Sequence, residues 1–214
     1  CNSLHHGNYL LSKVEGYEHQ TQKPKLHSVE LVLRWLRRSS VQPPPSCRQM
    51  PWVTSAADVM VGYLLLDSLV GNTDRHHENW GVLALGTVAG LSVELAPSFD
   101  HASSLGRENT DDRRCRLLAE LDHRATVEIY CSKGRSPFFS VGSSPRALSP
   151  RDAFGYAQRL LPEAAAGWLD QLQKAPMTIL NEAILSLPQE VATDTAKRFA
   201  SAVLQCNYTF LLNS

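Results

Sequence analysis

The polar segment Gly71–Trp80, with the sequence GNTDRHHENW, is the feature that most constrains the fold of this chain. It follows the apolar run Val59–Val70, which belongs to a predicted helix with Thr54 or Ser55 as its N-cap. It leads into a second apolar run, Trp80–Leu85, which is short enough to be a strand. A loop this polar, held between a buried helix and a strand, must lie where its side chains can meet solvent or a ligand.

The segments around this loop predict a fold that is mainly α with small β-hairpins, an α+β class. The runs Trp80–Leu85 and Leu91–Ala96 are separated by Gly86 and Gly90, which is typical of a hairpin. Residues 1–26 are polar and are expected to be irregular, and the prolines of 39–51 predict a loop. Further helices are expected at 28–38, 54–71, 110–122, 150–161, 163–173, 175–186 and 188–211.

The composition argues against several classes of protein. The 214 residues suit one ordinary domain or one lobe of a larger protein. Lys and Arg together number 21, as do Asp and Glu, so the charge balance gives no argument for binding to nucleic acid or to an anionic membrane. The five cysteines are widely spaced without a CxxC pair, which argues against a disulfide framework or structural zinc and favours a reducing cytoplasm. No apolar run approaches the 18 residues of a membrane-spanning helix.

Three side chains in and after the polar segment carry the chemistry that the sequence predicts. Asp74 and Asn79 lie five positions apart in the loop, and Asp100 follows the second strand of the predicted hairpin. Kinase-type phosphoryl transfer uses this order of parts, in which one aspartate orients the substrate hydroxyl or accepts its proton. An asparagine and a second aspartate then hold Mg²⁺ on the phosphates of ATP. The pattern therefore favours an ATP- and Mg²⁺-dependent phosphotransferase.

At these residues the chain resembles a known family. The segments Gly71–Gly81 and Leu95–Gly106 resemble the catalytic core of HipA-like serine/threonine kinases, which occur in bacteria as toxin–antitoxin kinases. A weaker resemblance to the C-terminal domain of that family runs from about residue 6 to residue 140. The order Asp-Arg-His, followed by an asparagine, is also similar to the loop of phosphoinositide-type kinases.

The resemblance implies a role for each residue of the site. Asp74 is implied to be the catalytic aspartate, and Asn79 and Asp100 are implied to be the metal ligands. His76 is implied to support the polar segment Gly71–Trp80, which is named the catalytic loop for this reason. The adjacent His76 and His77 lack the spacing of a zinc site, which favours the loop-bracing role.

The parts of the family that hold the nucleotide lie upstream of what is residue 1 here. Neither a glycine-rich phosphate loop nor its partner lysine precedes the polar segment, so residues 1–214 are expected to be a kinase-like C-terminal lobe without the N-terminal nucleotide lobe. Residues 1–53 would be the post-hinge segment and first helix, 54–106 the catalytic and metal-binding core, and 107–214 a helical subdomain.

The implied function is transfer of the ATP γ-phosphate to a Ser or Thr hydroxyl of a protein substrate in the bacterial cytoplasm. The chain is expected to be inactive without an N-terminal-lobe partner, and an antitoxin is a further implied partner. Neither a membrane nor nucleic acid is expected to bind directly. Two other functions stay open, a non-catalytic kinase-like binding scaffold and a kinase of small molecules or lipids.

Several arginines are candidates for contacts with the substrate. Arg75 lies in the catalytic loop and Arg107 follows the Asp100 segment. The nearby Arg113, Arg114 and Arg116 could receive an acidic substrate or a phosphorylated segment. A solvated helix face is the alternative interpretation of this cluster.

Overall fold

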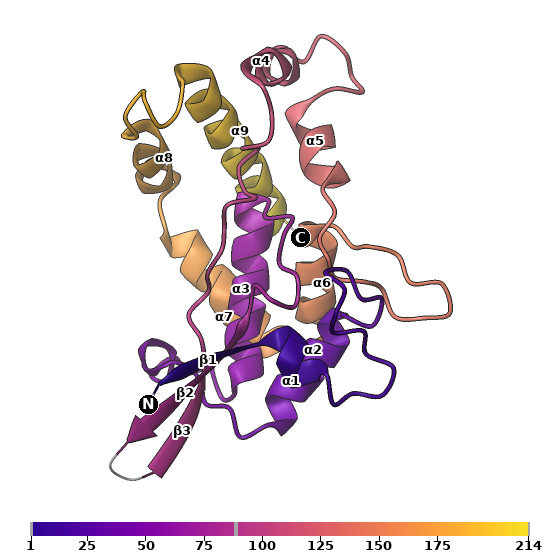
Figure 1. Ribbon diagram of the computed structural model, residues 1–214. Helices are drawn as coiled ribbons and strands as arrows, with labels where there is room; N and C mark the ends of the chain where they lie inside the picture. Colours follow the sequence, from indigo (N-terminus) through magenta and orange to yellow (C-terminus); the bar gives the residue numbers. More distant parts are fainter. Residues whose placement is uncertain (1, 88–89, 214) are drawn as a thin grey trace.

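The computed structural model describes residues 2–87 and 90–213. One long helix, α3, runs through the middle of the molecule, with other helices around it and a small sheet at one end (Figure 1). This mainly helical architecture with a three-stranded antiparallel sheet confirms the α+β prediction. The elements in chain order are β1 (Ser3–His6), α1 (Gly7–Leu11), α2 (Val29–Arg38), the 3₁₀ helix η1 (Pro45–Cys47), α3 (Ala56–Val70), β2 (Gly81–Thr87), β3 (Gly90–Leu95), α4 (Asp111–Ala119), α5 (Val127–Lys133), α6 (Pro150–Leu160), α7 (Pro162–Lys174), α8 (Met177–Leu185) and α9 (Asp194–Leu212).

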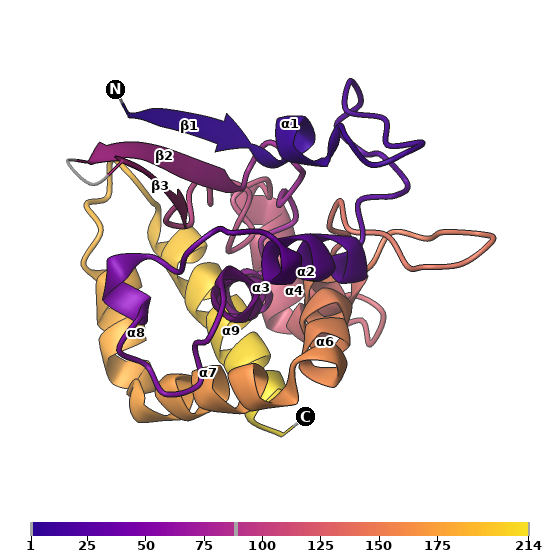
Figure 2. The ribbon, with the colours of Figure 1, turned by 90° about the horizontal axis from the view of Figure 1, so that it is seen from below.

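Helix α3 is buried on nearly every side, because its apolar residues cover the whole circumference of the helix. It packs against α2, α6, α7 and α9, and Figure 2 shows it end-on among them. The Asp58 carboxylate accepts the backbone amide of Ser55 at 2.8 Å, which caps the first turn where the sequence predicted the cap. The helix ends at Gly71, whose φ of 64° lies in the left-handed region that glycine adopts without strain.

The predicted hairpin is present as β2 and β3, paired antiparallel with Val82 opposite Leu95. Both of these side chains are buried, and they turn one face of the hairpin toward the helical core. Strand β1 pairs with the other edge of β2. A Cβ atom on Gly81 would lie 2.4 Å from the carbonyl oxygen of His5, so glycine is required for this close approach. Residues 88–89 of the predicted turn lie outside the described residues.

The prediction that residues 1–26 are irregular was wrong for the segment 3–11. Strand β1 has the sequence SLHH, which lacks the alternation of apolar and polar residues that indicates a strand. It becomes a strand because its backbone pairs with β2, a partner far away in the sequence. The short helix α1 follows directly and buries Leu11 completely.

Serine and threonine caps decide where several of the other helices begin. The hydroxyls of Ser28 and Ser149 cap α2 and α6, close to where the sequence predicted these helices to begin. Helix α5, capped by Thr126, was missed because it is only 7 residues long. Helix α9 begins at Asp194 rather than at 188, because the Thr193 hydroxyl accepts the amide of Ala196 and fixes the first turn there. Within the described ranges, no helix combines the length and apolar character needed to cross a bilayer.

Candidate catalytic and metal-binding site

The polar loop is fixed to the end of α3 by Asn72, which is fully buried. The Asn72 backbone amide donates to the Asp67 carbonyl at 2.8 Å, and its side-chain amide donates to the Asp67 carboxylate at 2.8 Å. The Asn72 side-chain oxygen accepts the backbone amide of Asp74 at 3.1 Å. One buried asparagine therefore joins the end of the helix to the predicted catalytic aspartate.

Asp74 presents its carboxylate to solvent while its backbone is held from both sides. Its carbonyl oxygen accepts the amide of His76 at 2.8 Å and the side-chain amide of Asn79 at 2.7 Å. The side chain is 45% exposed, and His76 Nε2 lies 4.0 Å from its Oδ1 atom. Within the described ranges no donor forms a hydrogen bond to this carboxylate, so it is free to accept one from a substrate hydroxyl.

Asn79 is almost completely buried, and its side-chain nitrogen is committed to the Asp74 carbonyl. Its backbone amide donates to the His76 carbonyl at 2.9 Å, which closes the loop into a compact turn. The Oδ1 atom accepts no hydrogen bond within the described ranges and is available to a ligand. An amide oxygen is a suitable ligand for a hard cation such as Mg²⁺.

Arg75 lies inside the protein and is only 1% exposed. Its Nε donates to Asp67 Oδ2 at 2.8 Å and its Nη2 donates to Asp67 Oδ1 at 2.7 Å, a two-point ion pair. Its Nη1 donates to the carbonyl of Asn79 at 2.8 Å and to that of Phe99 at 3.3 Å. A buried guanidinium committed in this way has no free surface for a substrate, so the structure contradicts the expected contact between Arg75 and the substrate.

Arg75 belongs to the catalytic loop and also contacts the segment that carries Asp100, so the two segments lie side by side. Ser98 Oγ accepts Arg75 Nη2 at 2.8 Å, and His101 Nδ1 lies 3.4 Å from the same nitrogen. Asp100 itself is exposed and has a φ of 54°, a left-handed conformation that is uncommon for residues other than glycine. Unusual backbone conformations of this kind cluster at functional sites.

The beginning of the chain braces the catalytic loop from the outside. The amide of Gly7 donates to the Trp80 carbonyl at 2.8 Å, and the amide of Asn8 donates to the His77 carbonyl at 2.8 Å. The His6 Nδ1 atom lies 2.6 Å from the Glu78 carbonyl oxygen. Residues 6–8 and the catalytic loop thus form one hydrogen-bonded unit.

His76 lies between the two acidic side chains of the loop. Its Nδ1 accepts the backbone amide of Glu78 at 3.1 Å, while its Nε2 faces Asp74. His77 points the other way, into the interior, with its Nδ1 at 2.8 Å from the Tyr17 hydroxyl. Burial lowers the pKa of His77, which keeps its ring neutral. Both histidines therefore brace the loop, and neither is arranged as one of a zinc-binding pair.

Asn79 and Asp100 carry oxygen atoms of the kind that Mg²⁺ prefers. Within the described ranges, no donor forms a hydrogen bond to Asn79 Oδ1 or to the exposed Asp100 carboxylate. No group of three His, Cys, Asp or Glu side chains forms a metal cluster in the part of the chain that the structure describes. Two protein oxygens are nevertheless what Mg²⁺ commonly takes from a protein when phosphate and water supply the rest.

Comparisons with known proteins show a structural similarity to a kinase. No protein-family model and no curated protein matches the chain. Among solved structures, the crystal structure of the Helicobacter pylori proinflammatory kinase CtkA is similar, with a TM-score of 0.59 and 17% sequence identity. The similarity covers 99% of this chain and 72% of the CtkA chain. This chain has a kinase-like fold. At 17% identity the likeness concerns the fold.

Four residues of the site in this kinase-like fold were not identified from the sequence: Asp67, Asn72, Ser98 and His101. Asp67 gave the clearest signal, because it interrupts an apolar helix and a buried carboxylate needs a partner. The remaining three became visible only when the fold brought the end of α3, the catalytic loop and the Asp100 segment together.

Proposed function

We propose that this chain supplies the catalytic aspartate and the metal ligands of a protein kinase, which transfers the γ-phosphate of ATP to a Ser or Thr hydroxyl. The proposal rests on the contacts of Arg75 with two carbonyl groups. A single nitrogen, Arg75 Nη1, binds the carbonyls of Asn79 and Phe99, and so fixes Asn79 beside the residue that precedes Asp100. The two candidate metal ligands come from separate segments, and the buried ion pair of Arg75 holds those segments in one place.

The free carboxylate of Asp74 would accept a hydrogen bond from the substrate hydroxyl and orient its oxygen toward the phosphate. Asn79 Oδ1 and the Asp100 carboxylate would hold Mg²⁺. When bound, Mg²⁺ neutralises the negative charge of the phosphates during transfer. His76 would keep the loop in shape through its hydrogen bond to the Glu78 amide.

The HipA-like resemblance of Gly71–Gly81 and Leu95–Gly106 supports the choice of a protein hydroxyl as acceptor. We propose that nucleotide binding is completed by an N-terminal lobe, in the same protein or on a partner, because the family that these segments resemble holds its nucleotide with such a lobe. A cytoplasmic bacterial setting and an antitoxin partner are parts of the same proposal.

The test measures transfer of label from γ-labelled ATP to casein, with the natural gene product that carries this chain. Asp74→Asn should lower the rate at least ~100-fold, because it removes a positioned acceptor of the hydroxyl proton. The matched control is Asp170→Asn, which alters an exposed aspartate of α7 that pairs with Lys174. Equal rates in Asp74→Asn and the parent would overturn the role of Asp74. No Mg²⁺-dependent labelling of casein or of the protein itself by the parent would favour the binding scaffold instead.

A further inference from the structure

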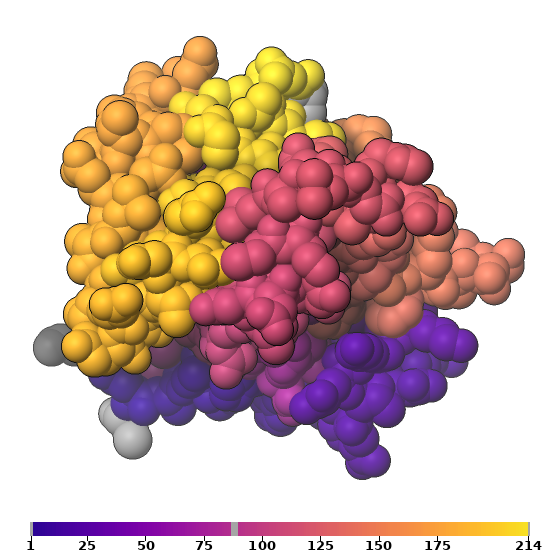
Figure 3. Space-filling view, turned by 90° about the horizontal axis from the view of Figure 1, so that it is seen from above, coloured from indigo at the N-terminus to yellow at the C-terminus, as the bar shows by residue number. Residues whose placement is uncertain are grey.

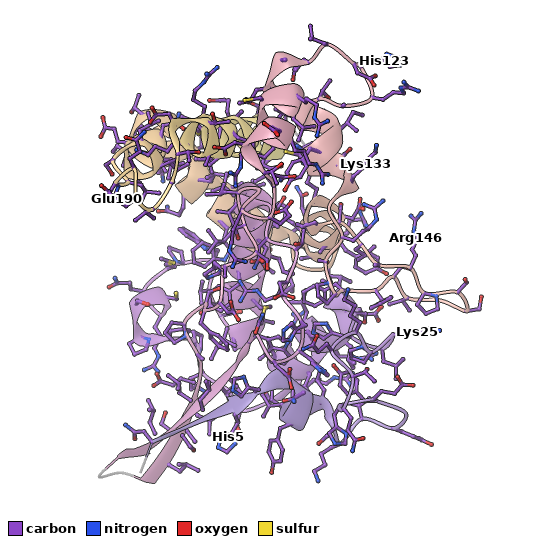
Figure 4. All side chains as sticks on the ribbon, turned by 45° about the horizontal axis from the view of Figure 1, so that its top comes forward. His5, Lys25, His123, Lys133, Arg146 and Glu190 are labelled. Carbon is purple, nitrogen blue, oxygen red and sulfur yellow. The ribbon has the colours of Figure 1, made fainter. Side chains whose placement is uncertain are left out.

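We propose that the groove between α4 and α5 binds an acidic stretch of the protein substrate and leads it to the catalytic loop. This inference rests on the proposed kinase function, since it names the class of substrate for that site. The α4–α5 segment forms an outer face of the molecule next to α9, as the rose and yellow regions of Figure 3 show. In Figure 4, Lys133 is labelled on this segment, at the end of α5.

The outer part of the groove has a volume of about 390 Å³ and a wall of cations. The four charged side chains that line it are Arg113, Arg116, Arg124 and Lys133, and no carboxylate lines it within the described ranges. Its floor is apolar and includes Leu117 and Ile129. A recess with basic walls and an apolar floor suits a peptide whose acidic side chains contact the walls while its apolar atoms contact the floor.

The inner part of the groove, about 170 Å³, reaches the catalytic loop. It shares Arg113, Tyr130 and Lys133 with the outer part, so the two parts adjoin across these side chains. Its far wall includes Gly71 and Thr73, and Thr73 is the residue immediately before Asp74. A peptide lying in the groove would therefore approach the catalytic loop along its length.

The end of α5 is fixed against the loop. A Cβ atom on Gly134 would lie 3.4 Å from Thr73 Cγ2, which shows how closely the two segments approach. The Thr73 backbone amide donates to the Ser103 carbonyl at 3.2 Å, so the same short stretch also touches the segment that carries Asp100. The groove and the candidate catalytic site thus share one backbone segment.

Most of the cations that line the groove have no carboxylate partner in the described part of the chain. In the described part of the chain, Arg113, Arg116 and Lys133 form no ion pair with a carboxylate. One carboxylate, that of Glu108, lines the inner part of the groove, whereas the nearby Asp122 lines neither part. Glu108 accepts the Tyr130 hydroxyl at 2.6 Å, and Asp122 pairs with Arg124 at 3.2 Å.

The two acidic residues at the start of α4 are engaged differently. Asp111 is held by Arg114 and by Thr193. Arg114 in turn donates to the carbonyls of Gly106 and Arg107, so this arginine has an internal role. The neighbouring Asp112 is exposed and does not line either part of the groove. Three cations are therefore left to attract an anionic ligand.

An acidic peptide fits these observations better than nucleic acid or a lipid surface. The chain as a whole has no net charge, whereas nucleic-acid-binding surfaces carry an extended excess of Lys and Arg. The cations line a recess with an apolar floor instead of projecting from a flat face toward a membrane. Continuity with the catalytic loop also points to the substrate as the occupant.

Binding can be measured by fluorescence anisotropy with two labelled peptides that contain one serine. In the first peptide four glutamates surround the serine, and in the second each glutamate is replaced by glutamine. We expect the natural protein to bind the acidic peptide at least ~10-fold more tightly in low salt and to lose the preference in high salt. The double substitution Arg113→Glu with Lys133→Glu should abolish the preference. Arg146→Glu is the matched control, because Arg146 is exposed on a loop away from the groove (Figure 4).

Equal binding of the two peptides, or a preference that survives the double substitution, would overturn the groove as an acidic-peptide site. Competition by single-stranded poly-uridine RNA or by phosphatidylserine vesicles that exceeds competition by the acidic peptide would also overturn it. The variant Asp74→Asn separates this inference from the proposed function, because it should keep the peptide preference while losing phosphate transfer. Phosphate transfer at equal rates to both peptides would support the kinase function but would overturn the proposed role of the groove in binding an acidic peptide.

Discussion

Asp67 and Arg75 form a two-point ion pair in the interior of the protein, with both side chains less than 5% exposed. Asp67 belongs to the last turns of α3 and Arg75 to the catalytic loop. The remaining guanidinium hydrogens are used on the carbonyls of Asn79 and Phe99 and on the Ser98 hydroxyl. The pair therefore determines the relative position of the catalytic loop and the segment that carries Asp100.

Breaking this pair should be costly, because the remaining charge would be buried without a partner. We expect Asp67→Asn to lower the free energy of unfolding by about 3–5 kcal/mol, measured by urea denaturation. Asp170→Asn is the control, since Asp170 and Lys174 form an exposed pair that contributes little. A decrease in Asp67→Asn no larger than that of the control would contradict the structural role of the pair.

Glycine at position 7 should be required by the packing of the chain start against the catalytic loop. A Cβ atom there would lie 2.3 Å from Trp80 Cε2 and 2.7 Å from the His77 carbonyl oxygen. Gly7→Ala should therefore lower the free energy of unfolding by about 1–3 kcal/mol in thermal or urea denaturation. Gly155→Ala is the matched control within helix α6, where the nearest atom to a new Cβ is Arg159 Nη1 at 4.0 Å. It should raise stability by about 0.5–1 kcal/mol, and similar losses in both variants would contradict the packing argument.

The central helix, the hairpin and the order of the candidate catalytic residues could be predicted from the sequence because each depends on local patterns. The apolar circumference of α3, its Ser55 cap and the terminating Gly71 are readable in consecutive residues. Strand β1 could not be predicted in this way, since its polar sequence becomes a strand only through pairing with β2.

The candidate site shows the same division between local and long-range information. The spacing of Asp74, Asn79 and Asp100 is visible in the sequence, but the burial of Arg75 is not. An arginine in a polar loop suggests a surface role, and only the fold brings Asp67 within 2.7 Å of it. Asp67 itself, a carboxylate in an apolar helix, was the available signal that a buried partner had to exist.

The stability of the protein should fall in mild acid because His27 is buried as a neutral ring. Trp80 Nε1 donates to its Nε2 at 3.2 Å, and its Nδ1 donates to the Pro137 carbonyl at 3.0 Å. Burial lowers the pKa of His27 to about 3, from 6.5 in the unfolded chain. Between these two values the unfolded state binds more protons, so stability is fully present above pH 6.5 and is lost as the pH falls toward 3.

Urea midpoints measured from pH 4.5 to 7.5 would test this dependence on His27. The slope in the parent should approach ~1.4 kcal/mol per pH unit for one such group, with His77 adding to it in the same direction. His27→Gln keeps a donor and an acceptor of similar shape and should flatten the slope. His123→Gln alters a histidine whose side chain is 90% exposed and should leave the slope unchanged. An unchanged slope in His27→Gln would contradict the assignment.

Asp100 combines a strained backbone with an unpartnered carboxylate, and the two can be separated by substitution. Its φ of 54° costs a residue with a side chain about 1 kcal/mol relative to glycine. Asp100→Gly should therefore keep or slightly raise the free energy of unfolding, because no hydrogen bond of the carboxylate is lost within the described ranges.

The same change, Asp100→Gly, should weaken binding of Mn²⁺, used as a paramagnetic substitute for Mg²⁺ and followed by broadening of the Asn79 amide resonances. Asp112→Gly, an exposed aspartate in the first turn of α4, is the control and should leave that broadening intact. Loss of stability in Asp100→Gly together with unchanged broadening would make Asp100 a structural residue and remove it from the metal site.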